Sequence, residues 1–122
     1  MNDGNRTMTV PELIAQYYGG VREFIDIDLD DNLDFSGANF EGAIFDGTWL
    51  FGANFRDCKL QNTSFRRCNL KCSDFRGADL RNAVFDAALE SSEFAGAILD
   101  GANFTGSTAY GYTMKPGEFP PQ

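Results

Sequence analysis

Large apolar residues recur at every fifth position through the middle of the chain. From Phe35 to Phe85, eleven consecutive slots with this spacing hold only phenylalanine or leucine. Two positions before each later centre, starting at Ala38, the chain carries a small residue: alanine, threonine, serine or cysteine. A small, a polar and a large residue in succession give the period-two pattern of a strand with two inward side chains. The next two positions are polar or glycine, as in Ser36-Gly37, which is typical of turns. We therefore predict repeated units, each a very short strand followed by a corner.

Several of these units resemble a known repeat. The stretches SGANF, EGAIF, FGANF, RGADL and DGANF look like the pentapeptide repeat, whose pattern is alanine, aspartate or asparagine, leucine or phenylalanine, and two variable residues. The resemblance implies a right-handed quadrilateral β-helix, in which four units form a coil of about twenty residues. The expected fold class is an all-β solenoid of about four such coils, with a short N-terminal α-helical cap.

The order of phenylalanine and leucine tests a four-sided coil. The fivefold phase slips once after Leu29 and once after Phe85, yet every fourth centre is of a similar kind. Because similar side chains pack into flush layers, this order predicts four stacked columns, with the slips as one-residue bulges or tightened corners. The four columns are Phe24, Phe45, Phe65, Phe85 and Phe104; Leu29, Leu50, Leu70 and Leu89; Phe35, Phe55, Phe75 and Phe94; and Phe40, Leu60, Leu80 and Leu99.

The two ends of the chain depart from the repeat. Thr9-Val10-Pro11-Glu12 has the form of a helix capping box, and apolar residues follow it at helical spacing until Gly19-Gly20. We predict that this helix covers the first coil, because the open end of a solenoid needs a cap. The expected division is a leader and capping helix over 1–21, the β-helix over 22–109 and a tail over 110–122.

For the tail, two alternatives stay open. Its aromatic residues Tyr110, Tyr112 and Phe119 either fold back as a second cap, or the segment, which contains proline and glycine, is mobile.

Composition excludes several classes of function. The chain of 122 residues has a net charge of −8, which argues against binding to nucleic acid phosphates. It contains no histidine and no glycine-rich phosphate loop, so we expect no enzymatic activity and no cofactor. The acidic stretch Asp26-Ile27-Asp28-Leu29-Asp30 imitates a calcium loop but has Asp31 where glycine is needed and Gly37 where glutamate is needed. We expect no metal site and read these aspartates as an outward acidic rim.

The cysteines and the apolar content bear on location. The three cysteines form an odd set without C-x-x-C spacing, which favours a reducing compartment. Cys58 and Cys68 fall in small inward slots on opposite faces, so we expect both to be buried and unbridged. No apolar run approaches the ~20 residues of a membrane span, and MNDGNRTMTV has no apolar signal region. We expect a cytoplasmic protein without membrane contact.

Charged residues are unevenly distributed along the repeats. Seven of the ten basic residues form what we call the basic belt: Arg56, Lys59, Arg66, Arg67, Lys71, Arg76 and Arg81. Acidic residues flank the belt, so stacked neighbours often have opposite sign, as with Asp46, Arg66 and Asp86. Either these residues form ordinary surface ion pairs, or the belt docks an acidic partner.

Two aromatic residues lie outside the inward pattern. Trp49 and Phe51 flank the inward Leu50 and must both point outward on the same face, where they suit a binding hot spot. Alternatively, the tail tyrosines or a second copy of the chain cover them.

Two functions follow from these features. The first is a non-enzymatic structural or protein-interaction module, whose partner is an unidentified protein or a second copy. Its candidate binding residues are Trp49, Phe51, Arg56, Arg66, Arg67, Lys71 and Arg76. The alternative comes from the family resemblance: some pentapeptide repeat proteins mimic DNA and inhibit or protect type II topoisomerases such as gyrase. That role needs a long anionic face, which the arginines of this chain interrupt.

Overall fold

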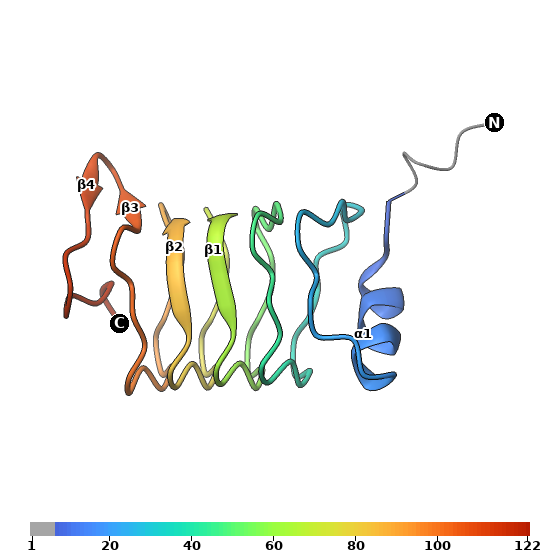
Figure 1. Cartoon of the computed structure of the whole chain (residues 1–122). Helices are drawn as coiled ribbons and strands as arrows, with labels where there is room; N and C mark the ends of the chain where they lie inside the picture. Colours follow the sequence, from blue (N-terminus) through green and yellow to red (C-terminus); the bar gives the residue numbers. More distant parts are fainter. Residues whose placement is uncertain (1–6) are drawn as a thin grey trace.

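The computed structural model describes residues 7–122 and shows a β-solenoid (Figure 1). Helix α1 (Val10–Tyr18) lies at one end of the stacked coils. The labelled strands are β1 (Ser64–Asn69), β2 (Val84–Ala88), β3 (Thr108–Ala109) and β4 (Tyr112–Thr113). They form one sheet in the order β1-β2-β3-β4, parallel except for the antiparallel pair β3 and β4.

Backbone pairing repeats with a step of about twenty residues. Asp34 bridges Asn54 and Asn54 bridges Asp74, all in parallel, and Asp74 then bridges Glu93. Most five-residue units contribute only one such isolated bridge, because each corner follows after three extended residues. Stacking of every fourth unit is therefore confirmed, as the sequence predicts. The handedness of the winding and the number of coils stay predictions.

The phenylalanine columns exist as stacks of rings inside the solenoid. In one column, Phe45 and Phe65 stack with centroids 5.3 Å apart, and Phe65 and Phe85 are 5.0 Å apart. In another, Phe55 and Phe75 are 5.0 Å apart with an interplanar angle of 7°. Rings of the two columns meet edge to face. All these rings are fully buried, so they supply much of the hydrophobic stabilisation.

The phase slip after Phe85 is absorbed where β1 and β2 pair. Phe65 lies opposite Phe85, but Asn69 lies opposite Ala88, so β2 spans the same corner with one residue fewer. At this corner β1 has the usual left-handed residue, Arg67 with a φ of 57°, whereas no residue of β2 has a positive φ. The predicted local irregularity is confirmed at this slip.

The small inward slots hold side chains that bond to the backbone of the adjacent coil. Thr48 Oγ1 donates to the carbonyl of Phe24 at 2.9 Å, and Ser73 Oγ donates to Leu50 at 2.9 Å. The Cys58 Sγ lies 2.9 Å from the carbonyl oxygen of Phe35. A buried hydroxyl or thiol therefore finds a partner without disturbing the core. Cys58 and Cys68 are buried and unbridged.

The polar position before each centre stabilises the corner that follows it. The Oδ1 atoms of Asp34, Asn54 and Asp74 each accept a hydrogen bond at 3.0 Å from the N–H group two residues later. These Asx turns explain the preference for aspartate or asparagine at this position. The second corner residue is usually left-handed, for example Gly37 with a φ of 73°, which explains the frequent glycine.

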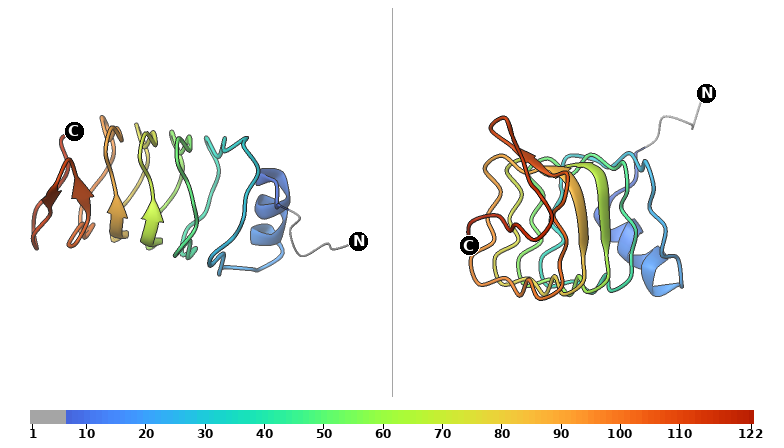
Figure 2. Two further views of the ribbon diagram at one scale, coloured as in Figure 1. Left: turned by 90° about the horizontal axis from the view of Figure 1, so that it is seen from above. Right: turned by 60° about the vertical axis from the view of Figure 1, so that its left-hand side comes forward.

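Helix α1 caps the first coil as predicted. Thr9 and Glu12 form the reciprocal capping box, with Glu12 Oε1 accepting from the Thr9 N–H at 2.9 Å. The inner face of the helix buries Val10, Leu13 and Tyr17. The Tyr17 ring meets Phe40 edge-on at 5.5 Å, which joins the helix to the ring core. Figure 2 shows α1 across one end of the coils.

The C-terminal segment lies against the last coil. Strands β3 and β4 form a short hairpin whose turn contains the predicted boundary at residues 109 and 110. Met114 is buried and its N–H donates to the Ser107 carbonyl at 2.8 Å. The Phe119 ring meets the terminal core ring of Phe104 edge-on at 5.9 Å. Met114 and Phe119 thus contact the last coil, whereas Tyr110 and Tyr112 are exposed, and the choice between the two alternatives for the tail stays a prediction.

Candidate interaction surface

Trp49 and Phe51 form an exposed aromatic pair on the outer wall. Leu50 between them is fully buried, whereas 66% of Trp49 and 47% of Phe51 are accessible. Their ring centroids lie 6.4 Å apart with an interplanar angle of 23°. Their predicted outward orientation is confirmed, and neither tyrosine of the tail makes a ring contact with them in residues 7–122. Their part in binding stays a prediction.

A hollow with an acidic rim borders this aromatic pair. Its volume is about 320 Å³, and we call it the acidic hollow. It is lined by Asp28, Leu29, Asp30, Asp31, Leu33, Trp49 and Phe51. Sequence reasoning found the aspartates and the aromatics separately but did not bring them together. The signal was available in the predicted leucine column, which places Leu29 next to Leu50 and therefore the aspartates that flank Leu29 near the two rings.

A second hollow lies on the opposite side of Trp49. It has a similar volume of about 320 Å³, and Arg67 and Lys71 give it positive charge, so we call it the basic hollow. Its remaining lining residues are Gly47, Thr48, Trp49, Cys68, Asn69 and Ala88. The structure thus brings two predicted belt residues next to the aromatic pair. Along this face the charge changes sign across Trp49.

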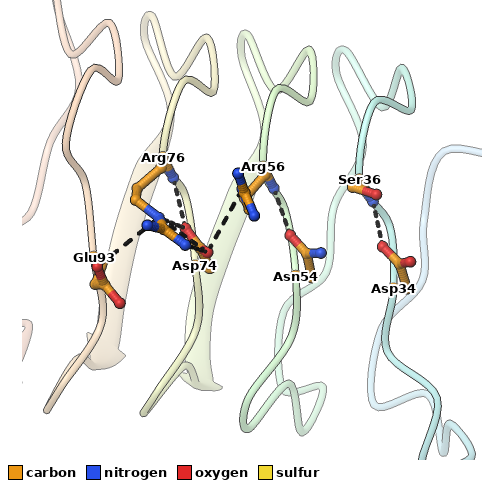
Figure 3. Close-up of polar contacts among 7 residues, drawn as sticks. All are labelled: Asp34, Ser36, Asn54, Arg56, Asp74, Arg76 and Glu93. Carbon is orange, nitrogen blue, oxygen red and sulfur yellow. Dashed lines mark hydrogen bonds and ion pairs between the residues drawn. The ribbon is translucent and has the colours of Figure 1, made fainter.

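Other arginines of the basic belt pair with acids of their own corners. The Arg76 guanidinium lies 2.7 Å from the Asp74 carboxylate, and Arg81 is equally close to Asp79. Arg56 also approaches Asp74, at 3.9 Å (Figure 3). The hydrogen bond from Arg76 lowers the pKa of Asp74 below its ordinary value, and that from Arg81 does the same for the pKa of Asp79. For these arginines the ordinary ion-pair alternative describes the geometry, and such half-exposed pairs contribute little.

The predicted ladder through Arg66 takes a different form. Arg66 lies opposite Asp86 in the strand register, but in residues 7–122 its guanidinium forms no ion pair with Asp86 or Asp46. Instead its Nη1 donates to Ser64 Oγ at 3.2 Å, and Ser64 donates to Asp46 Oδ1 at 2.6 Å. The ladder is a hydrogen-bonded relay, because the serine hydroxyl stands between the two charges.

The described residues contain neither a metal-binding cluster nor a membrane-spanning helix. Within residues 7–122, no group of three or more cysteine, aspartate or glutamate side chains is arranged to hold a metal ion. In the same part of the chain, no helix has the length and apolar character that crossing a bilayer requires.

Burial raises the pKa of the Cys58 thiol to about 11 and that of Cys68 to about 12, which makes both poor nucleophiles.

The fold and the wall together define a class of protein: a capped β-solenoid that displays outward side chains on a regular framework. Residues 31–57 and 50–86 match the family model for pentapeptide repeats, in eight copies. The chain belongs to the pentapeptide repeat family.

Solved structures of similar proteins support this assignment. A pentapeptide repeat protein from Nostoc PCC 7120 is 28% identical, with a TM-score of 0.62, and the match covers 93% of this chain and 90% of that one. One from the thylakoid lumen of Arabidopsis thaliana is also 28% identical, with a TM-score of 0.60, over 70% of this chain and 56% of that one.

A third similar structure is QnrB1, a plasmid-mediated fluoroquinolone resistance protein. In a trypsin-treated form it is 26% identical, with a TM-score of 0.57, over 69% of this chain and 46% of its own. The present chain thus matches about half the length of the Arabidopsis protein and of QnrB1. No curated protein sequence matches the chain significantly.

Proposed function

We propose that this protein is a non-enzymatic protein-interaction module whose anchor is the pair Trp49 and Phe51. The observation that carries the proposal is the exposure of both rings, 66% and 47%, with hollows of opposite charge on the two sides of Trp49. Tryptophan is among the residues that most often dominate binding energy at interfaces. A partner that covers both rings and reaches both hollows gains apolar burial and charge complementarity together.

The rigidity of the wall supports this role. The residue between the two rings is held in the leucine column, and the Leu50 N–H donates to the Asn69 carbonyl at 2.9 Å. The backbone next to Phe51 is fixed by a second hydrogen bond, in which the Gly52 N–H donates to the Lys71 carbonyl at 2.8 Å. A surface that is ordered before binding loses little entropy when a partner docks, so a modest contact area can suffice.

The rest of the proposal follows from the family and the site. Pentapeptide repeat proteins are generally structural modules, and the raised thiol pKa values of Cys58 and Cys68 remove two potential nucleophiles. We also propose that the chain winds right-handed in about four coils. A cytoplasmic location is part of the proposal, because three free thiols suit a reducing compartment. The net charge of −8 favours a protein partner over nucleic acid.

The test is affinity capture from lysate of the source cell with three forms of the protein. The first is the wild type, the second carries Trp49→Ser with Phe51→Ser, and the third carries Ile25→Ser with Ile98→Ser. The two isoleucines are 43% and 45% exposed, so the third form is a matched loss of exposed apolar surface elsewhere. We expect a partner that the wild type and the isoleucine variant retain and the aromatic variant loses. Equal retention by all three folded forms would contradict the proposal.

A second candidate is inhibition or protection of a type II topoisomerase by DNA mimicry. The similarity to QnrB1 and the net charge of −8 favour it. Arg56, Arg76 and Arg81 interrupt the anionic wall, however, and the match covers only 46% of QnrB1. A gyrase supercoiling assay separates the two candidates. Dose-dependent inhibition or protection that survives Trp49→Ser with Phe51→Ser would support mimicry, whereas no effect of the wild type would exclude it.

A further inference from the structure

We propose that the acidic hollow binds the guanidinium group of an arginine side chain in an extended segment of the partner. This inference rests on the proposed function and names the chemistry of the partner at that same surface. The site consists of the faces of Trp49 and Phe51 together with the carboxylates of Asp28, Asp30 and Asp31.

The negative charge of the hollow has no counterpart in the described chain. Within residues 7–122, none of the carboxylates of Asp28, Asp30 and Asp31 forms an ion pair. Asp74 and Asp79, by contrast, each hold an arginine at 2.7 Å. Three unpaired carboxylates on the rim of one concave surface create a local negative potential, and such a potential attracts a cation from outside.

The shape of the site selects the kind of cation. The carboxylates do not form a metal-binding cluster, so a small ion would not be coordinated by all of them. A guanidinium is planar, stacks on aromatic faces and donates through several N–H groups spread in a plane. It can therefore lie on a ring and still reach carboxylates on the rim. The volume of about 320 Å³ lies at the lower end of known ligand sites, and it suits one long side chain.

The basic hollow adds a condition on the neighbouring residues of the partner. Arg67 and Lys71 on the far side of Trp49 would repel a second cation and attract an acidic side chain. Asp30 and Phe51 line the acidic hollow, and the Gly52 N–H donates to the Lys71 carbonyl of the next coil, so the two charged regions are about two coil steps, roughly 10 Å, apart. Side chains two positions apart in an extended peptide point to the same face and lie about 7 Å apart, and the long arginine side chain covers the remaining distance. The predicted recognition pattern is an arginine and an acidic residue two positions apart.

The experiment uses Trp49 as its reporter, because it is the single tryptophan of the chain. The probe is the capped peptide Gly-Arg-Gly-Glu-Gly, titrated into ¹⁵N-labelled protein while the indole N–H cross-peak is followed. The comparison peptides replace arginine by glutamine, arginine by lysine, or glutamate by glutamine. We expect a saturable shift with the parent peptide, weaker binding for the lysine and Glu→Gln forms, and none with the Arg→Gln form.

Two charge-matched variants test whether peptide binding requires the carboxylates of the acidic hollow or only the net charge of the protein. One carries Asp28→Asn, Asp30→Asn and Asp31→Asn, and the control carries Glu23→Gln, Glu41→Gln and Asp100→Asn. The two variants have the same net charge, and the control residues do not line the hollow. We expect affinity to fall about tenfold for the first and less than twofold for the control. Dispersed spectra verify that each variant is folded.

Three results would overturn the inference: equal affinity of both variants, an indole shift that the Arg→Gln peptide reproduces, or no shift at about 10 mM peptide. None of these results bears on whether the aromatic pair binds some partner, which the capture experiment decides separately. If capture depends on the aromatic pair but the titration fails, the proposed interaction module stands and the proposed arginine binding is wrong.

Discussion

Replacement of Phe65 by alanine probes the ring columns most directly. The Phe65 side chain is fully buried in the middle of the solenoid. It stacks on Phe45 at 5.3 Å and on Phe85 at 5.0 Å. It also meets Phe55 and Phe75 edge to face, at 5.6 Å and 5.7 Å. The variant Phe65→Ala would therefore remove four ring contacts and leave a cavity with rings on several sides.

The position in the column sets the size of the effect. A buried Phe→Ala replacement costs about 3–5 kcal/mol, and the cost is highest where the surroundings cannot collapse. Rings in neighbouring coils are held by backbone bonds such as the 2.8 Å bond from the Phe45 N–H to Ser64, so we expect about 5 kcal/mol for Phe65→Ala. Phe24 at the end of the same column has a single ring contact within residues 7–122, to Phe45 at 5.8 Å. For Phe24→Ala we expect about 3 kcal/mol.

Urea unfolding followed by circular dichroism measures both variants against the wild type. A loss of about 5 kcal/mol corresponds to a fall of roughly 15–20 °C in Tm for a chain of this size. Phe65→Leu is the control, because leucine fills the equivalent slot of neighbouring columns, and we expect it to recover much of the loss. Equal destabilisation by Phe65→Ala and Phe24→Ala would refute the reasoning, since the number of ring contacts would then not matter.

Three further predictions concern the small slots, the thiols and the corner charges. Ala78→Phe should overpack a fully buried slot and lower stability by about 3 kcal/mol or more, and a soluble variant with unchanged thermal melting would contradict this packing. Iodoacetamide at pH 8 should modify only the exposed Cys72 in the folded protein, because the pKa values of Cys58 and Cys68 are raised to about 11 and about 12; mass spectrometry counts the adducts, and two or three would argue against burial. The pKa of Asp74 is lowered by its arginine, so the stability that this carboxylate contributes is complete above its ordinary pKa and is lost as pH falls through the lower folded value. The urea midpoint of the wild type should therefore exceed that of Asp74→Asn at pH 7, and the gap should narrow as pH falls below about 4; a gap that stays constant down to about pH 2 would be inconsistent with this charge effect.

Pairing of the surface charges shows where sequence reasoning fell short. The sequence places charges of opposite sign in successive coils, and the expectation was ladders between coils. The structure instead pairs Arg76 with Asp74, two residues earlier, at 2.7 Å, while Arg56 of the adjacent coil reaches the same carboxylate only at 3.9 Å. Residues on either side of an inward centre point outward together, so the short reach within one unit outcompetes the step between coils.

The repeating unit itself was determined by the sequence. The order of large, small and polar residues fixes which side chains face inward, and the alternation of phenylalanine and leucine fixes which units stack, because rings and branched chains pack best on their own kind. The capping box at Thr9 and Glu12 likewise needs only four consecutive residues. Such local patterns carry their physical reason within a few positions of the chain.

Contacts between outward side chains of different coils were decided by the tertiary structure. Trp49 and Phe51 line one hollow with the aspartates around Leu29 because the coils lie side by side with an offset of about twenty residues, altered by the slip after Leu29. The same stacking places Arg67 and Lys71 on the other side of Trp49. No inward packing rule constrains these side chains, so their neighbours depend on the exact register of the coils. The core could therefore be read from the sequence, whereas the binding surface required the three-dimensional structure.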